Sequence, residues 1–258
     1  MSDTILEFAE LEKHFGGVTA LDSFSMKVRR GKIVGLIGPN GSGKTTSFNV
    51  MTGIYTPNHG KVIFDGTEIT ALPARKVYEA GVARTFQRSR LCLPLSIFDN
   101  IMIGNHANLN GGLWFNLVNR RALRRQFEEN YEKAHALVET FSRDLAERMF
   151  EPVGALPMIE RRRIEICRAL ISGPKLLLLD EPSAGMTHDE TAQLMNDILD
   201  VRSRSGDLSI IIIEHEMGVI ERITDHCVVL NYGRKISEGS YAEIASDPEV
   251  QSAYLGVD

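Results

Sequence analysis

Residues 38–45 read Gly38-Pro39-Asn40-Gly41-Ser42-Gly43-Lys44-Thr45, which fits the pattern G-x-x-x-x-G-K-[ST] without a mismatch. The apolar run 33–37 precedes this stretch, and residues 46–51 can begin a helix after it. A strand, a loop and a helix in this order form the context in which the pattern binds phosphate. Glycines let the backbone wrap closely around phosphate groups, and consecutive N–H groups at a helix N-terminus supply positive potential. The stretch therefore predicts that the chain binds a nucleoside triphosphate.

Two side chains of this phosphate loop (residues 38–45) carry the predicted chemistry. Lys44 is expected to reach the β- and γ-phosphates, and the Thr45 hydroxyl is expected to ligate Mg²⁺. A glycine-rich turn that happens to contain a lysine is the alternative, and the flanking strand and helix weigh against it. The expected nucleotide contacts within and beside the loop are Gly38, Pro39, Asn40, Gly41, Ser42, Gly43, Lys44, Thr45 and Thr46.

The composition is that of an ordinary globular protein. The chain has 258 residues, of which 43% are hydrophobic and 24% charged, and its formal net charge is −5. This charge gives no overall attraction to nucleic acid or to an anionic membrane surface, so we expect no nucleic-acid partner. The cysteines are scattered and odd in number, which indicates a reducing compartment without a disulfide framework. They are Cys92, Cys167 and Cys227.

No segment is predicted to cross a membrane or to direct secretion. The first twelve residues include four acidic ones and lack the basic start and long apolar stretch of a signal peptide. The longest apolar runs, such as 176–179 and 210–213, are far too short to span a bilayer. Any membrane role is therefore expected to be peripheral.

The order of predicted elements is that of an α/β protein. The continuous apolar runs 176–180 and 209–213 are typical of parallel strands buried on both faces. Predicted helices separate these strands from the next ones, which gives the βα alternation of such folds. The predicted strands are 5–11, 21–28, 33–37, 61–66, 82–86, 176–180, 209–213, 227–231 and 235–238. The predicted helices of the core are 74–80, 189–202, 217–224 and two short ones within 241–255.

The stretch between residues 88 and 171 has a different character. Residues 105–116 are polar and rich in glycine, which predicts a loop. Apolar residues recur at helical spacing through 119–142, and a second helix is predicted from about 160 to 171. The first helix begins with four arginines, which could bind nucleic acid or form a solvated face, and the acids one turn later favour the solvated face. These features predict an inserted helical lobe.

Two acidic residues end one of the buried strands. Asp180 and Glu181 follow the leucine run 176–179, at the strand end where ligands bind in a doubly wound sheet. We expect Asp180 to hold Mg²⁺, directly or through water, beside Thr45. Glu181 is then placed to polarise the attacking water. A strand that merely ends in polar residues is the alternative, and the upstream phosphate loop favours the functional interpretation.

Polar residues also follow two other predicted strands. His215 comes after the strand 209–213, where a histidine can hydrogen-bond the γ-phosphate, although a lone histidine is more often a surface residue. Gln87 follows the strand 82–86 and can reach metal or water where the chain enters the helical lobe. A glutamine at this position is, by itself, almost no indication of function.

The order of these motifs resembles that of an ABC-type ATPase: phosphate loop, Gln87, a helical segment, Asp180 with Glu181, and His215. The chain resembles most the ATP-binding subunits of bacterial ABC importers for branched-chain, hydrophobic amino acids. The resemblance covers nearly the whole chain. Besides the shared motifs it includes the stretches 15–21, 81–87, 163–170 and 253–256. The lipopolysaccharide-export ATPase is similar too.

This resemblance implies a fold and a set of ligands. The fold implied is one ABC ATPase domain over residues 1–258, a P-loop NTPase core of mainly parallel sheet with an antiparallel β part and an inserted α-helical lobe. The core would take residues 1–87 and 172–258, and the lobe residues 88–171. The cofactors implied are ATP and Mg²⁺, with Phe15 stacking on the adenine. The implied catalytic residues are Lys44, Gln87, Glu181 and His215, and the implied metal ligands are Thr45, Gln87 and Asp180.

The resemblance also implies partners and a location. Two membrane-spanning permease subunits would dock through a coupling helix on the segment 87–103 and the lobe beyond it. A second ATP-binding subunit would pair head to tail with this chain, and a periplasmic solute-binding protein would act indirectly. The subunit would then lie at the cytoplasmic face of the bacterial inner membrane as a peripheral protein.

One segment departs from the family pattern. The signature that contacts the partner's ATP is usually Leu-Ser-Gly-Gly-Gln, whereas this chain has Leu156-Pro157-Met158-Ile159-Glu160. Pro157 offers neither a hydroxyl nor an N–H, and Met158 and Ile159 put side chains where the backbone must approach phosphate. Losing one such donor costs about 3 kcal/mol in oxyanion sites. We therefore expect a weak site at this segment, which favours a heterodimer over a homodimer.

Three functions follow from these observations. ATP hydrolysis that energises import of a small solute, expected to be a branched-chain or other hydrophobic amino acid, is favoured by intact Glu181 and His215. An ATPase of a lipopolysaccharide-export-like system is the first alternative. The second is a regulatory subunit that binds ATP with weak hydrolysis, which the degenerate signature favours.

Overall fold

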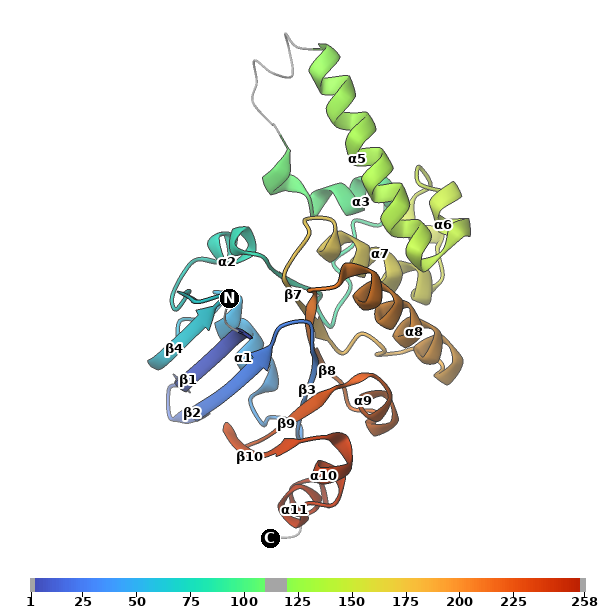
Figure 1. The fold of residues 1–258 in the computed structure, drawn as a ribbon. Coiled ribbons are helices and arrows are strands. Elements are labelled where there is room, and N and C mark those ends of the chain that lie inside the picture. Colours follow the sequence, from blue (N-terminus) through green and yellow to red (C-terminus); the bar gives the residue numbers. More distant parts are fainter. Residues whose placement is uncertain (1–2, 110–119, 256–258) are drawn as a thin grey trace.

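The structure is a computed structural model that describes residues 3–109 and 120–255 (Figure 1). Its larger sheet is parallel from β9 to β6, with β10 antiparallel at one edge. In spatial order the strands are β10 (Arg234–Gly239), β9 (His226–Asn231), β3 (Ile33–Ile37), β8 (Ser209–Ile213), β7 (Leu176–Asp180) and β6 (Val82–Arg84). A smaller antiparallel sheet has the order β2 (Val18–Arg29), β1 (Thr4–Phe15), β4 (His59–Phe64) and β5 (Thr67–Glu68).

The helices form two groups (Figure 1). Those around the sheets are α1 (Lys44–Met51), α2 (Ala74–Ala80), α8 (His188–Ser205), α9 (Met217–Ile223), α10 (Tyr241–Ala245) and α11 (Pro248–Leu255). Those in the upper right of Figure 1 are α3 (Ile97–Ile103), α5 (Arg120–Phe141), α6 (Arg143–Glu147) and α7 (Met158–Leu170), with short 3-10 turns at His106–Asn108 and Val153–Ala155. The second group is the predicted helical lobe.

Alternate residues of the buried strands pack into two separate apolar clusters. On β8, Ile210 and Ile212 belong to the cluster that includes residues of α7, α8 and α9 and of the lobe. Ile211 and Ile213 belong to the cluster that includes residues of α1 and of the antiparallel sheet. Both faces of the larger sheet are therefore covered, which explains the nearly continuous apolar runs of its central strands β3, β7 and β8.

The predicted fold class is confirmed, since a mainly parallel core, an antiparallel part and a helical lobe are all present. Several boundaries differ. β1 continues to Phe15 instead of ending at residue 11, and α7 begins at Met158, two residues before its predicted start. β6 ends at Arg84 rather than at residue 86, because its ladder with β7 stops there and the chain turns toward the lobe. Part of the predicted loop 105–116, from residue 110 on, lies outside the described residues.

The helix α3 was not predicted from the sequence. It has only seven residues, and Ser96 caps it by accepting a hydrogen bond from the Asp99 N–H. Such a short helix offers too little periodicity to identify. The division of the chain at residues 87 and 172 stays a prediction.

The double-sided burial of β8 makes its isoleucines sensitive to truncation. We expect Ile211→Ala to lower the free energy of unfolding by about 2–5 kcal/mol, because Ile211 is fully buried. The matched control is Ile54→Ala, since Ile54 is half exposed, and it should change stability by no more than about 0.5 kcal/mol. Urea unfolding measures both, and equal effects would contradict the assignment of Ile211 to the core.

Candidate nucleotide-binding site

The predicted site residues come together because four parallel strands end at the same edge of the larger sheet. β3, β8, β7 and β6 are neighbours in that order. The phosphate loop follows β3, and His215 follows β8. Asp180 is the last residue of β7, and Gln87 lies three residues beyond β6. Residues separated by more than a hundred positions in sequence are therefore adjacent in space.

The phosphate loop has a backbone that only glycine adopts easily. Gly38 and Gly43 have φ angles of 148° and 109°. A Cβ at Gly38 would lie 2.0 Å from the carbonyl oxygen of Leu230, and one at Gly43 would lie 2.5 Å from that of Ala20. At Gly41 a Cβ would meet nothing within 4 Å, so the loop is open on that side. The loop is thus packed against its own chain at two glycines and accessible at the third.

Lys44 is buried beneath this loop. Its Nζ donates hydrogen bonds to the carbonyl oxygens of Gly38, at 2.7 Å, and Pro39, at 2.9 Å. Burial lowers the pKa of Lys44, while the negative charges of Glu181 and Asp180 act in the opposite direction and favour the ammonium. The cation therefore lies between the loop and the two carboxylates.

A cleft of about 160 Å³ opens over the phosphate loop. Its lining brings together residues of the loop with residues that follow β7 and β8. The lining residues are Ala20, Asn40, Gly41, Ser42, Gly43, Lys44, Thr45, Thr46, Glu181 and His215. Backbone N–H groups and a lysine on one side face a carboxylate and an imidazole on the other, which is a setting for phosphate and a reacting water.

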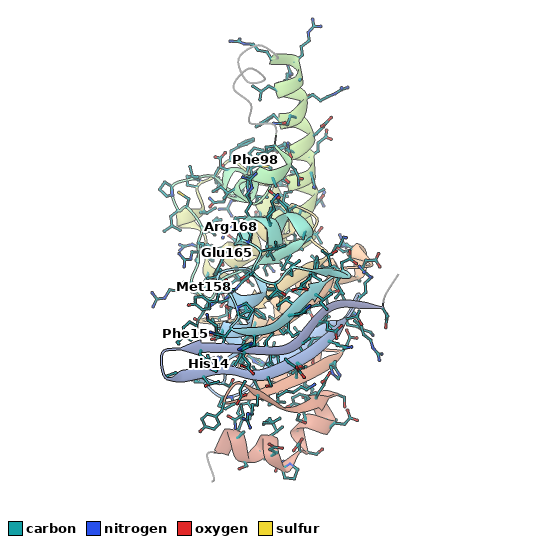
Figure 2. The ribbon with its side chains drawn as sticks, turned by 90° about the vertical axis from the view of Figure 1, so that its left-hand side faces the viewer. His14, Phe15, Phe98, Met158, Glu165 and Arg168 are labelled. Carbon is teal, nitrogen blue, oxygen red and sulfur yellow. The ribbon has the colours of Figure 1, made fainter. Side chains whose placement is uncertain are left out.

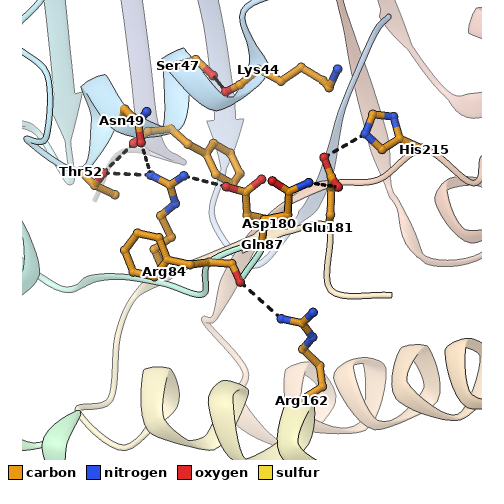
Figure 3. A network of polar contacts seen from close by, with 12 residues as sticks. Lys44, Ser47, Asn49, Thr52, Arg84, Gln87, Arg162, Asp180, Glu181 and His215 are labelled. Carbon is orange, nitrogen blue, oxygen red and sulfur yellow. Dashed lines mark hydrogen bonds and ion pairs between the residues drawn. The ribbon is translucent and has the colours of Figure 1, made fainter. Parts of the chain in front are cut away.

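Glu181 is held from two sides (Figure 3). Its Oε1 lies 2.9 Å from the Nε2 of His215, and its Oε2 accepts a hydrogen bond from the Nε2 of Gln87 at 2.7 Å. Its φ angle is 49°, a left-handed conformation that costs of order 1–3 kcal/mol for a residue other than glycine. Three side chains named from the sequence thus form one hydrogen-bonded cluster next to the phosphate loop.

Asp180 has a partner that the sequence did not suggest. Its Oδ2 lies 2.6 Å from the Nη2 of Arg84, and both side chains are almost completely buried. Arg84 is the last residue of β6, where a charge stands in an otherwise apolar strand. That break in the pattern is the one signal by which sequence reasoning could have found it.

Glu214 is a second functional candidate that was missed. It is buried, and its Oε1 accepts hydrogen bonds from the backbone N–H of Ser183, at 2.8 Å, and from the Ser183 hydroxyl, at 2.6 Å. Burial raises the pKa of Glu214, and the hydrogen bonds from Ser183 oppose that rise. Glu214 directly precedes His215, so its bonds to Ser183 connect the loop after Glu181 to the end of β8.

The residues present fit a magnesium ion that is bound together with a nucleotide. Among the described residues no three His, Cys, Asp or Glu side chains cluster as a metal site of their own. Mg²⁺ usually takes one or two carboxylates and completes its shell with phosphate oxygens and water. Thr45 lines the cleft, Asp180 directly precedes the lining residue Glu181, and Gln87 is hydrogen-bonded to Glu181, so these three would hold Mg²⁺.

Phe15 lies apart from the phosphate cleft. It is partly exposed near the end of β1, where its ring contacts the Tyr55 ring edge-on at 5.1 Å and Lys13 Nζ lies 5.1 Å from its centroid. Figure 2 shows Phe15 beside His14 at the end of the antiparallel sheet. Its stacking on adenine stays a prediction, as do the roles assigned to the other site residues.

Comparison with protein families agrees with this geometry. A model described as ABC transporter matches residues 21–184, which is more than half of the chain. The chain belongs to the ABC transporter family. This ABC subunit is therefore an ATPase of the class coupled to transport. A second model, described as branched-chain amino acid ATP-binding cassette transporter, matches residues 234–258.

Relatives and solved structures extend the similarity over the full length. The subunit is 39% identical to the high-affinity branched-chain amino acid transport ATP-binding protein BraF of Pseudomonas aeruginosa, over 99% of each chain. It is 34% identical to LivG of Escherichia coli, again over 99% of each chain. The ADP conformation of MJ1267, an ATP-binding cassette of an ABC transporter, matches with a TM-score of 0.84 and 29% identity, covering 99% of this chain and 100% of that one.

The signature-like segment of this ABC subunit begins α7. Pro157 precedes the helix and makes no side-chain cap, and Met158 is half exposed in its first turn. The Met158 Sδ and Cε would lie 3.4 Å from a Cβ at Gly185, so the side chain lies over the loop that follows Glu181. The helix N-terminus is present, but side chains stand where the family pattern has glycines.

Helix α7 also bonds to the chain on both sides of Gln87. The Nη1 of Arg162 donates to the Phe86 carbonyl oxygen at 3.3 Å and to Glu165 Oε2 at 2.8 Å. Glu165 Oε1 accepts from the backbone N–H of Arg90, and Arg168 donates to the Arg90 carbonyl oxygen. Figure 2 shows Arg168 and Glu165 along this helix between Phe98 and the sheets. The lobe is therefore bonded directly to the chain on either side of Gln87.

No helix of residues 3–109 and 120–255 is long and apolar enough to cross a membrane.

The position of Lys44 between the loop and the acids predicts its contribution to nucleotide affinity. We expect Lys44→Met to weaken ATP binding at least tenfold, because a hydrogen bond to a charged group contributes about 1.5–3 kcal/mol. Titration with a fluorescent ATP analogue measures the affinity. Lys61→Met is the control, since Lys61 forms an exposed pair with Glu68 on the antiparallel sheet. An affinity within about twofold of wild type for Lys44→Met would contradict the assignment.

Proposed function

We propose that this ABC subunit hydrolyses Mg-ATP to energise the uptake of branched-chain or other small hydrophobic amino acids. The observation that carries the proposal is Glu181, which is held by Gln87 and His215 at the edge of the phosphate cleft. The solute class is supported by the names of the relatives and by the match of the C-terminal segment to a branched-chain amino acid transporter model.

The arrangement of side chains suggests how hydrolysis proceeds. Lys44 and the loop N–H groups bind and orient the phosphates, which leaves the γ-phosphate facing Glu181 and His215. Glu181 is an ionisable acceptor that can orient a water and take its proton. His215 fixes one carboxylate oxygen and Gln87 the other, so Glu181 has one orientation. Bound Mg²⁺ supplies charge neutralisation for the phosphate oxygens.

The proposed partners are two permease subunits and a second ATP-binding subunit, with a periplasmic solute-binding protein acting indirectly. The segment 87–103 supports permease docking, since it exposes the apolar side chains of Leu93, Leu95 and Ile103. The segment is also hydrogen-bonded to α7 through Arg90, so a permease that moves the segment would also act on α7, the helix that begins at the signature-like segment. On this proposal the subunit is peripheral, at the cytoplasmic face of the bacterial inner membrane.

The division into a core of residues 1–87 and 172–258 and a lobe of residues 88–171 belongs to the same proposal. The bonds from α7 to Phe86 and Arg90 support it, because they lie on either side of the proposed boundary at Gln87. Import is favoured over lipopolysaccharide export, because the similar proteins BraF and LivG are named for branched-chain amino acid transport.

A regulatory subunit that binds ATP with weak hydrolysis is the second candidate, and the side chains of Pro157, Met158 and Ile159 favour it. Replacing the Glu181 carboxylate by an amide distinguishes the hydrolysing subunit from the regulatory one. If the subunit hydrolyses ATP, Glu181→Gln in the assembled transporter should lower turnover about a hundredfold, the order of loss expected when a general base is removed. ATP binding should remain, since Lys44 is intact. An unchanged ATPase rate, measured by phosphate release, would support the binding-only role.

The signature-like segment predicts a gain of function. Replacing Pro157, Met158 and Ile159 by Ser, Gly and Gly should raise ATP turnover per complex severalfold, because each restored donor to phosphate is worth up to about 3 kcal/mol. The rise should appear where this segment faces the partner's phosphate loop in a heterodimer. A control that replaces only Met158, by Ala, restores no side-chain donor and should gain less. A triple variant no faster than wild type would refute the weak-site interpretation.

A further inference from the structure

Arg84 is a buried cation that the mechanism above does not use. Its side chain is 5% exposed, and that of Asp180 is 4% exposed. The Nη2 of Arg84 lies 2.6 Å from Asp180 Oδ2, while its Nη1 donates to Asn49 Oδ1 at 2.7 Å (Figure 3). The rings of Phe48 and Phe86 lie 5.3 and 5.0 Å from the guanidinium carbon. The guanidinium is therefore fixed on both of its ends and by two aromatic rings.

These contacts join three elements that each carry part of the site. Asn49 is on α1, the helix that begins with Lys44 and Thr45. Asp180 ends β7, and Arg84 ends β6, three residues before Gln87. Because a guanidinium presents its donors in a rigid fork, it sets the spacing between Asn49 and Asp180 in a way a flexible ammonium cannot. The fork thus places the Asp180 carboxylate relative to the helix of the phosphate loop.

The two oxygens of Asp180 are not equivalent. Oδ2 accepts the bond from Arg84, and within the described part of the chain no hydrogen bond or ion pair of Oδ1 is found. A carboxylate that holds a metal needs an oxygen free for it, and a fixed partner on the other oxygen determines how that free oxygen is presented.

We propose that Arg84 is a positioning residue for magnesium: it engages Asp180 through Oδ2 and anchors it to Asn49, which leaves Oδ1 as the oxygen available to the metal. This inference rests on the proposed use of Mg-ATP. Breaking a buried ion pair by itself would lower stability. A purely structural pair would therefore alter folding stability alone, whereas a positioning pair must also alter the effect of Mg²⁺ on nucleotide binding.

The test compares nucleotide affinity with and without the metal in the full chain. A fluorescent ATP analogue is titrated in excess Mg²⁺ and again in EDTA, and the ratio of the two affinities is the magnesium gain. For Arg84→Gln we expect the gain to fall about tenfold or more, as for other residues that hold a metal ligand. The affinity in EDTA should stay within about twofold, because the phosphate loop and Lys44 bind the phosphates directly.

Two further variants separate position from charge. Arg84→Lys keeps the cation but not the fork, and should leave the gain well below wild type. Arg163→Gln is the matched control, since Arg163 forms a largely buried pair with Asp197 at 2.8 Å, and it should keep the wild-type gain. If Arg84→Gln does not fold, Asn49→Ala decides the matter, because it removes the anchor on α1 and should lower the gain.

Several outcomes would overturn the inference. These are a folded Arg84→Gln with the wild-type gain, equal losses in Arg84→Gln and Arg163→Gln, or an unchanged gain in Asn49→Ala. A wild-type chain that binds nucleotide with no magnesium gain would overturn it as well. Failure of the proposed function is a different result, namely no phosphate release by the assembled transporter, and it leaves the magnesium gain readable.

Discussion

The parallel pairing of β3, β8 and β7 is the constraint on which the rest of the structure depends. Its register places Ile211 of β8 opposite Val34 of β3 on one side and opposite Leu178 of β7 on the other. Because the strands are parallel, all three have their carboxyl ends at one edge of the sheet. The phosphate loop, the pair Glu214 and His215, and the pair Asp180 and Glu181 lie at these ends. An antiparallel arrangement of the same strands would send these residues to opposite edges, and no common cleft would form.

Charge compensation is the second organising constraint, because that edge holds several ionisable groups in partly buried positions. Each is matched by a specific partner: Lys44 by loop carbonyls, Asp180 by Arg84, and Glu181 by Gln87 and His215. Burying an ion without such a partner costs several kcal/mol. The compensation also restricts orientation, because each of these side chains bonds to a defined partner.

The lobe shares this constraint through α7. Arg162 and Glu165 are both buried and pair with each other at 2.8 Å, and they bind backbone groups on either side of Gln87. The chain on either side of Gln87, the partner of Glu181, is therefore bonded to α7. Because the same helix begins at the signature-like segment, α7 links that segment to the surroundings of Glu181.

The class of the fold, the phosphate loop and the residues at the strand ends could all be predicted from the sequence. These features are local, since a loop motif and a run of apolar residues are visible within a dozen positions. The pairing of these groups could not be predicted, because it depends on the folded chain: Arg84 pairs with Asp180 across 96 positions, Gln87 with Glu181 across 94, and Glu214 with Ser183 across 31. The short helix α3 and the early end of β6 also depended on neighbours in space. Pairing depends on strand order and on which face each side chain occupies, and neither is encoded in a local pattern.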